Sequence, residues 1–113
     1  MATHHDPAVE KARWEIAEAA RAMMGGALSF IEGARRIHSL SFAGKLDTDP
    51  DIDPFSGIAG DTDALPIGPE RINWAQEALQ RLQPEIDIAE RWARELGWPY
   101  CQRLIDRFGV STG

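Results

Sequence analysis

Six aspartates lie close together near the middle of the chain, and closely spaced carboxylates are the groups that bind hard cations such as Ca²⁺. They are Asp47, Asp49, Asp51, Asp53, Asp61 and Asp63. An EF-hand calcium loop needs Gly at its sixth position and Glu at its twelfth. Counted from Asp47, these positions hold Ile52 and Ile58, and the register that starts two residues later fails as well. We therefore predict no metal site, and we expect these carboxylates to lie in turns and caps in contact with water.

Cys101 and Arg107 have the Cys-x5-Arg spacing of tyrosine phosphatases, in which backbone N–H groups of the intervening loop bind phosphate. Here the intervening residues include no Gly and have a helical pattern, so the sequence favours a buried, unreactive thiol. The sequence also lacks the motifs of phosphate-binding loops, zinc proteases and serine hydrolases. The sequence therefore assigns no catalytic residue and no cofactor, and it favours a non-enzymatic protein over an enzyme.

The net negative charge lies in residues 46–68, a segment rich in Pro and Gly that we call the acidic connector. The chain has 12 basic and 18 acidic side chains, and its formal net charge is −6 at pH 7. The six aspartates of the acidic connector account for −6, because residues 1–45 carry +1 and residues 69–113 carry −1. We hypothesise that the connector attracts a basic protein partner, with an exposed Trp as anchor. The expected contact residues are Asp47, Asp49, Asp51, Asp53 and Trp74.

This charge distribution is typical of an immunity or antitoxin-like inhibitor, in which an acidic loop covers the basic active site of a toxin. The alternative is a small helical homodimer whose acidic loop is purely structural and favours solubility. A sequence pI near 4.9 argues against nucleic acid as the partner, because that binding depends on Lys and Arg neutralising phosphates. The sequence has neither a membrane-spanning apolar run nor an apolar signal core, and its single Cys excludes an internal disulfide. We therefore expect no membrane association and a cytoplasmic location.

Five charged residues form an alternative candidate site, a small-ligand or enzymatic pocket where the acidic connector crosses the helices. They are Glu32, Arg35, Asp61, Asp63 and Arg71. Within this set, we expect Arg35 to bind the carboxylate of Asp61 or Asp63 and thereby order the connector. The other interpretation is that Arg35 pairs with Glu32 on the exposed surface of one helix.

Capping residues and helical periodicity predict two helices before the acidic connector. Asp6 and Pro7 are typical of a helix start, and the Gly pair at 25–26 is typical of a helix end. Ser29 and Glu32 have the spacing of a capping box, in which each side chain binds the other residue's N–H, so a second helix should begin there.

Two further features concern packing. Gly33, inside the second helix, indicates close approach of another backbone. Within the acidic connector, residues 51–59 favour one short helical turn that buries Phe55 and Ile58, and residues 65–69 should be extended because residues before Pro avoid the α region.

The sequence after the acidic connector predicts three helices. The first starts near Pro69 and breaks before Pro84, which starts the next one. Gly97 should end that helix, and Pro99 should open the last one. Because no segment alternates with period two, we predict an all-α fold. It is a compact bundle of about five short helices in one domain, residues 1–113, with a frayed tail at residues 1–6 and the connector between helices two and three.

Two short motifs resemble a family of small bacterial proteins known only as a domain of unknown function. The motifs are E-G-A-R at residues 32–35 and T-D-x-L-P within residues 61–66. The positions that also match the family's pattern are Arg71, Trp74 and Cys101. Tyr100 departs from the pattern, because the family has a small residue there. The resemblance spans roughly residues 14–107, and it implies a compact helical domain with no established activity.

Overall fold

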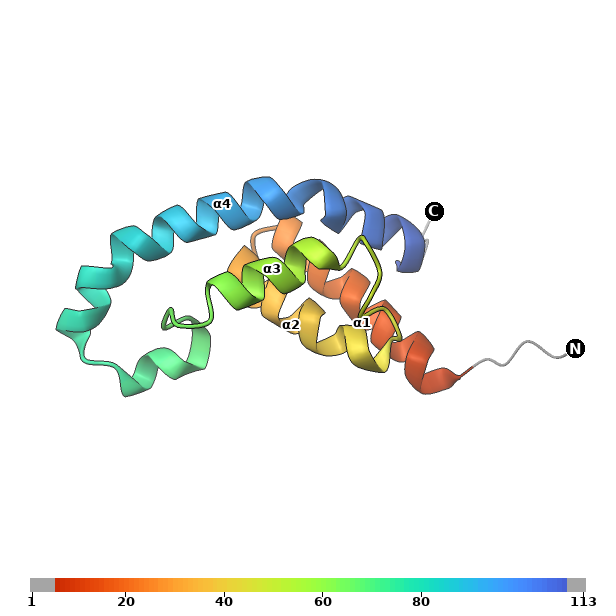
Figure 1. Ribbon diagram of the computed structural model, residues 1–113, viewed down its shortest axis with the longest axis horizontal. Helices are drawn as coiled ribbons and strands as arrows, with labels where there is room; N and C mark the ends of the chain where they lie inside the picture. Colours follow the sequence, from red (N-terminus) through yellow and green to blue (C-terminus); the bar gives the residue numbers. More distant parts are fainter. Residues whose placement is uncertain (1–5, 110–113) are drawn as a thin grey trace, which may run out of the picture.

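The structure is a computed structural model that describes residues 6–109, and in this part of the chain it contains five helices and no strand (Figure 1). The elements are α1 (Pro7–Met24), α2 (Phe30–Ala43), α3 (Asp53–Asp61), the 3₁₀ helix η1 (Gly68–Asn73) and α4 (Gln76–Phe108). The predicted all-α bundle is therefore confirmed. The prediction of a frayed tail falls on residues that, apart from Asp6, lie outside the described part.

α1 and α2 form an antiparallel hairpin whose start is set by the predicted capping residues. The Asp6 carboxylate accepts a hydrogen bond from the Ala8 N–H at 3.0 Å, and Pro7 is the first helical residue. α1 ends at Gly25, as predicted, and Gly26 follows with a φ of 86°, a conformation that favours Gly. Near the start of α1, Arg13 Nε donates to the carbonyl of Gly44 just after α2, at 2.8 Å, so the two helices run in opposite directions.

The N-terminus of α2 is capped by Ser29 and by a carboxylate of α4 rather than by a complete capping box. Ser29 Oγ accepts from the Glu32 N–H at 3.0 Å, as predicted. The return bond from the Glu32 side chain to Ser29 does not form. Instead, the Glu90 carboxylate of α4 accepts from the N–H groups of Phe30 and Ile31, at 2.7 and 3.1 Å. The predicted capping box is therefore only half correct, because a residue distant in sequence supplies the second acceptor.

Gly33 does allow a close approach, but a side chain makes it. The Met23 side chain occupies the space in which a Cβ at residue 33 would lie. The predicted approach of another backbone was therefore wrong. The packing reason is that α1 and α2 are neighbours in a hairpin (Figure 1), and the buried Met23 side chain of α1 packs directly against α2 at Gly33.

α4 is one helix of 33 residues where three were predicted. Pro84 and Pro99 both lie inside it. Gly97 is also internal, and its lack of a side chain lets the Phe55 ring pack against the helix, because a Cβ there would lie 3.0 Å from that ring. The predicted breaks were wrong because one buried face continues along α4 past both exposed prolines and includes Gly97. Its buried residues are Ile86, Ala93, Gly97, Cys101 and Leu104.

The core lies where α1, α2, α3 and the second half of α4 meet (Figure 1). From the acidic connector, Phe55 and Ile58 are fully buried on α3, which confirms that part of the prediction. The first half of α4 extends past α1 and α2, and η1 returns beside it at the left of the picture. The chain therefore presents one face of α4 and the end of α3 outside the core.

Candidate functional site

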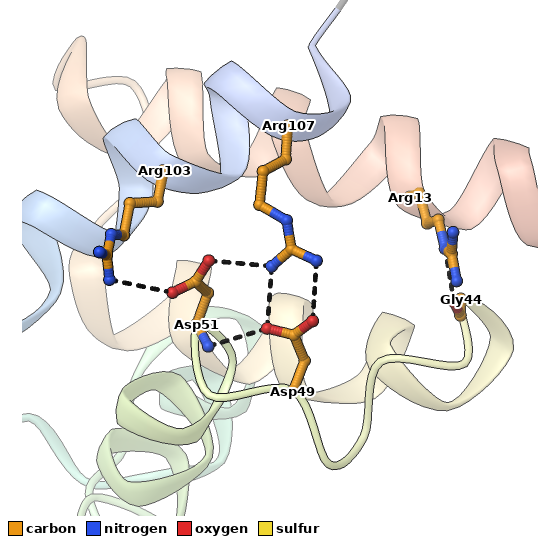
Figure 2. A network of polar contacts seen from close by, with 6 residues as sticks. All are labelled: Arg13, Gly44, Asp49, Asp51, Arg103 and Arg107. Carbon is orange, nitrogen blue, oxygen red and sulfur yellow. Dashed lines mark hydrogen bonds and ion pairs between the residues drawn. The ribbon is translucent and has the colours of Figure 1, made fainter.

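The acidic connector is held to the last turns of α4 by a network of ion pairs. The Arg107 guanidinium donates to both carboxylate oxygens of Asp49, at 2.9 and 2.8 Å, and to Asp51 at 2.9 Å (Figure 2). Arg103 makes a longer contact with Asp51, at 3.3 Å. The two aspartate side chains are only 16% and 15% exposed. This network closes the segment between α2 and α3 onto the C-terminal end of the bundle.

The ion pairs shift the ionisation of the groups that form them. The hydrogen bond from Arg107 is the main cause that holds the pKa of Asp49 below its ordinary value, and the backbone N–H of Asp51 acts in the same direction. Asp49 in turn is the main cause that raises the pKa of Arg107. Both groups therefore stay charged at neutral pH.

The predicted partner-binding residues do not form one free surface. Asp49 and Asp51 are occupied by the protein's own arginines, which corrects the expectation that all four aspartates face a partner. Asp47 and Asp53 are exposed. Trp74 is also exposed, but it follows η1, which lies beyond the C-terminal end of α3, whereas Asp53 is the first residue of α3 (Figure 1). The predicted anchor and the predicted acids are therefore apart.

Arg35 orders the connector, as predicted, but through different acceptors. Its guanidinium donates to the carbonyls of Thr62 and Leu65, at 2.5 and 3.2 Å, and to the Glu70 carboxylate at 2.7 Å. The expected carboxylates of Asp61 and Asp63 are exposed instead and take no part. Glu70 also accepts from the Ile67 N–H at 2.9 Å. That bond is the main cause that lowers the pKa of Glu70, and Arg35 adds to it.

A groove lies between the middle of α4 and the end of α3, and we call it the α4 groove. Its volume is about 420 Å³. The lining residues are Asp61, Thr62, Ala64, Leu65, Glu85, Ile88, Ala89 and Trp92. Ile88 is 64% exposed and Trp92 is 39% exposed, although both side chains are large and apolar. Leu96, one turn further along α4, continues the apolar row and is also exposed.

The two charged residues that line the α4 groove are both acidic. Asp61 lies at the end of α3 and Glu85 lies on α4, and both are exposed. Neither carboxylate forms an ion pair with another residue of the described range 6–109. The groove therefore combines an apolar floor with two carboxylates that are free to bind cationic groups.

A second cavity, of about 300 Å³, lies between α2, η1 and α4, and we call it the Glu32 pocket. Its lining residues are Ser29, Glu32, Ile67, Gly68, Arg71, Gln83, Ile86, Asp87 and Glu90. Of the five residues in the predicted pocket, the structure brings together only Glu32 and Arg71. Arg35 donates to a backbone carbonyl of the loop after α3, Asp61 lines the α4 groove, and Asp63 is exposed in the turn after α3.

Neither an activated thiol nor a metal-binding cluster is present in the part of the chain that the structure describes. Burial raises the pKa of the Cys101 thiol to about 12, so this thiol is a poor nucleophile at neutral pH. No group of three or more His, Cys, Asp or Glu side chains within residues 6–109 is arranged to hold a metal ion. His38 Nδ1 and Ser56 Oγ are 2.8 Å apart, but neither residue lines the α4 groove or the Glu32 pocket. This pair links α2 to α3.

The exposed apolar row on α4 was missed by the sequence interpretation. Ile88, Trp92 and Leu96 recur at four-residue spacing, which is the signal that could have found it. The same stretch also contains Ile86 and Ala93 at helical spacing, and these are the residues that pack on the core. The sequence therefore carries two apolar faces, and periodicity does not say which one is covered.

Comparison of the chain with protein-family models, with curated proteins and with solved structures finds no match. The resemblance to a bacterial family of unknown function therefore stays a prediction. Among residues 6–109, no helix is both long enough and apolar enough to cross a membrane. The interpretation of function accordingly depends on the geometry of the α4 groove and the Glu32 pocket.

Proposed function

We propose that the protein is a non-enzymatic binding protein, and that a basic segment of a partner protein docks in the α4 groove. The observation that carries this proposal is the presence of exposed apolar side chains and two unpaired carboxylates in one groove. The proposal keeps the basic partner predicted from the sequence. It moves the contact from the aspartates at 47–53 to α4, because Arg103 and Arg107 already bind two of them.

The apolar side chains of the groove would supply most of the affinity. Ile88 and Trp92 lie one turn apart, and a partner that covers them removes apolar surface from water at about 25 cal/mol per Å². Trp side chains in the centre of an interface are among the residues that contribute most to binding. Trp92 therefore takes the anchor role that the sequence interpretation gave to Trp74.

The carboxylates would select the partner and orient it. Asp61 and Glu85 come from different elements, so a segment lying in the groove meets an acid from each. The partner that matches this arrangement has apolar side chains with Lys or Arg next to them. A protein with a cationic active site, covered by an inhibitor of the immunity or antitoxin type, is the class of complex that fits best.

Selection of a phage-displayed library of random peptides on the full-length chain tests the proposal. We expect enrichment of peptides that combine large apolar residues with Lys or Arg. Their binding should be lost with Trp92→Glu, because this substitution removes the apolar anchor and places an ionised group where an apolar side chain of the peptide must pack. The matched control is Phe42→Glu, because Phe42 is an exposed aromatic residue on α2 that does not line the groove.

Two outcomes would overturn the proposal. The first is enrichment of peptides without basic residues, or of peptides that bind the Trp92→Glu chain as well as the wild-type chain. The second is sedimentation of the unliganded chain as a dimer that Trp92→Glu dissociates. That result would assign the α4 groove to a second copy of this chain, which is the homodimer weighed from the sequence.

A further inference from the structure

We propose that the Glu32 pocket binds a small zwitterion of the α-amino-acid type, with the ammonium group at Glu32 and the carboxylate group at Arg71. This site shares no lining residue with the α4 groove, so it goes beyond the proposed function and does not depend on it. Its volume of about 300 Å³ is at the lower end of the range for ligand pockets in proteins.

The pocket is built where two segments distant in sequence meet. Gly68 has a φ of 71°, and a Cβ at this position would lie 3.2 Å from the carboxyl carbon of Glu32. The positive φ favours Gly at this position, and the absence of a side chain lets the η1 backbone lie close to the Glu32 carboxylate. Arg35, one turn after Glu32 on α2, holds the same loop through Thr62 and Leu65. The loop is thus fixed over the Glu32 side chain.

Several polar groups of the pocket are already satisfied within the protein. Both Glu90 oxygens accept backbone N–H groups of α2, and Ser29 caps the same helix, so the α2 N-terminus is not the binding group. One Asp87 carboxylate oxygen accepts a hydrogen bond from the Gln83 amide at 2.7 Å, and the second oxygen accepts none from the described residues. These groups shape the wall of the pocket.

Glu32 and Arg71 remain as opposite charges without partners in the described residues. They line the same cavity but do not form an ion pair with each other. The lining of the same cavity also includes two apolar side chains, Ile67 and Ile86, which are largely buried. A molecule with an ammonium group, a carboxylate and an apolar side chain matches all three features.

The test compares three probes with nearly the same carbon skeleton: leucine, isoamylamine, which lacks the carboxylate, and isocaproate, which lacks the amine. Each is titrated into the full-length chain while the amide NMR spectrum is recorded. We expect leucine to shift the amide signals of Ile67 and Gly68, and to bind at least about tenfold more tightly than either analogue. Equal affinity for leucine and isoamylamine, or no shift up to about 10 mM, would overturn the proposal.

Variants distinguish a direct contact from a folding defect. Arg71→Gln should weaken the binding of leucine by about tenfold or more and leave the affinity for isoamylamine unchanged, because only leucine of these two carries a carboxylate. Glu32→Gln should weaken the binding of leucine and leave the affinity for isocaproate unchanged, because isocaproate lacks the ammonium group. Arg81→Gln, an exposed residue of α4 outside the pocket, is the matched control and should change nothing. A loss that is the same for all three probes with Arg71→Gln would contradict the assignment of the carboxylate to Arg71.

Discussion

Arg35 and Arg107 each hold part of the acidic connector against a helix, although they bind different chemical groups. Arg107 binds two carboxylates at the start of the connector. Arg35 binds two backbone carbonyls near its end, together with Glu70. Because the fork of a guanidinium can serve several acceptors at once, one Arg at each end of the connector adds polar contacts to the packing of its buried residues, such as Phe55 and Ile58, on the core.

Replacing Arg35 tests the first of these anchors. Arg35→Met keeps the apolar stem but removes the donor of the Leu65 carbonyl and leaves the Thr62 carbonyl with the Leu65 N–H alone, so we expect the free energy of unfolding to fall by about 1–3 kcal/mol. Urea unfolding of the full chain measures it. Arg36→Met is the matched control, because Arg36 is the exposed neighbour, and it should change stability by less than about 0.5 kcal/mol. Equal effects of the two substitutions would refute the anchor role.

The ion pair of Asp49 predicts a pH dependence of stability. The pKa of Asp49 is lower in the folded chain than in the unfolded chain, so its contribution is complete above the unfolded pKa of about 4 and is lost as the pH falls through the folded pKa. Arg107 is 39% exposed, so water screens the pair and we expect it to contribute only about 1 kcal/mol. The unfolding free energies of wild type and Asp49→Asn should therefore differ at pH 7 and converge below about pH 4. A difference that is constant from pH 7 to pH 3 would argue against the ion pair.

At the residue scale, the sequence indicates that Arg35 forms a structural contact, but it does not identify the groups that Arg35 binds. The role of Arg35 as a loop anchor follows from its position beside an apolar stripe. Its main acceptors are backbone carbonyls, which every residue has, so no sequence signal points to Thr62 or Leu65. Glu90 accepts the Phe30 N–H at the start of α2 from 60 positions away in the chain, and no local pattern around Glu90 indicates this contact. Such pairings depend on the tertiary fold.

α4 is the element that determines the form of the candidate sites. One of its faces packs on the core, and the opposite face carries Ile88. Because the helix does not break at Pro84, its first half continues past α1 and α2 and forms one wall of the Glu32 pocket. If α4 were two separate helices, the wall of the Glu32 pocket and the exposed face that carries Ile88 would not be held in a fixed position relative to each other.

Replacing Pro84 tests whether α4 is continuous. Pro84 lies inside the helix and lacks an N–H, so Pro84→Ala restores a helical hydrogen bond and should raise the unfolding free energy by about 1 kcal/mol or more. Pro69→Ala is the control, because Pro69 lies in the first turn of η1, where Pro is favourable, and no gain is expected. If Pro84 began a separate helix, Pro84→Ala would not raise the unfolding free energy either. Urea unfolding of the two variants therefore distinguishes a continuous α4 from a helix that starts at Pro84.

At the element scale, the first half of the chain could be predicted better than the second. Asp6, Ser29 and the Gly pair at 25–26 act locally, and the ends of α1 and the start of α2 lie where they indicate. Pro84, Pro99 and Gly97 are equally strong local signals, but continuous burial of one helix face outweighs them. Local rules fail here because packing with the Phe30 and Phe55 rings decides the outcome.

At the scale of the whole molecule, the acidic connector does not behave as one charged surface. Its aspartates divide into two that are paired with arginines and four that are exposed. Of the exposed ones, Asp61 lies in a groove with apolar side chains. Net charge per segment can be read from a sequence, but the division between paired and free carboxylates requires the fold. The proposed function therefore depends on the surface of α4 rather than on total charge.

The affinity of a selected basic peptide for the Asp61→Asn, Glu85→Gln double variant, measured at low and high salt, tests the central claim most directly. The matched control is the Asp47→Asn, Asp53→Asn pair, which removes the same charge outside the α4 groove. We predict that the groove variant binds about threefold to tenfold more weakly than wild type at low salt and loses most of its salt dependence, while the control keeps both. Unchanged affinity and salt dependence in the groove variant, or an equal loss in the control, would contradict the proposed docking of a basic partner in this groove.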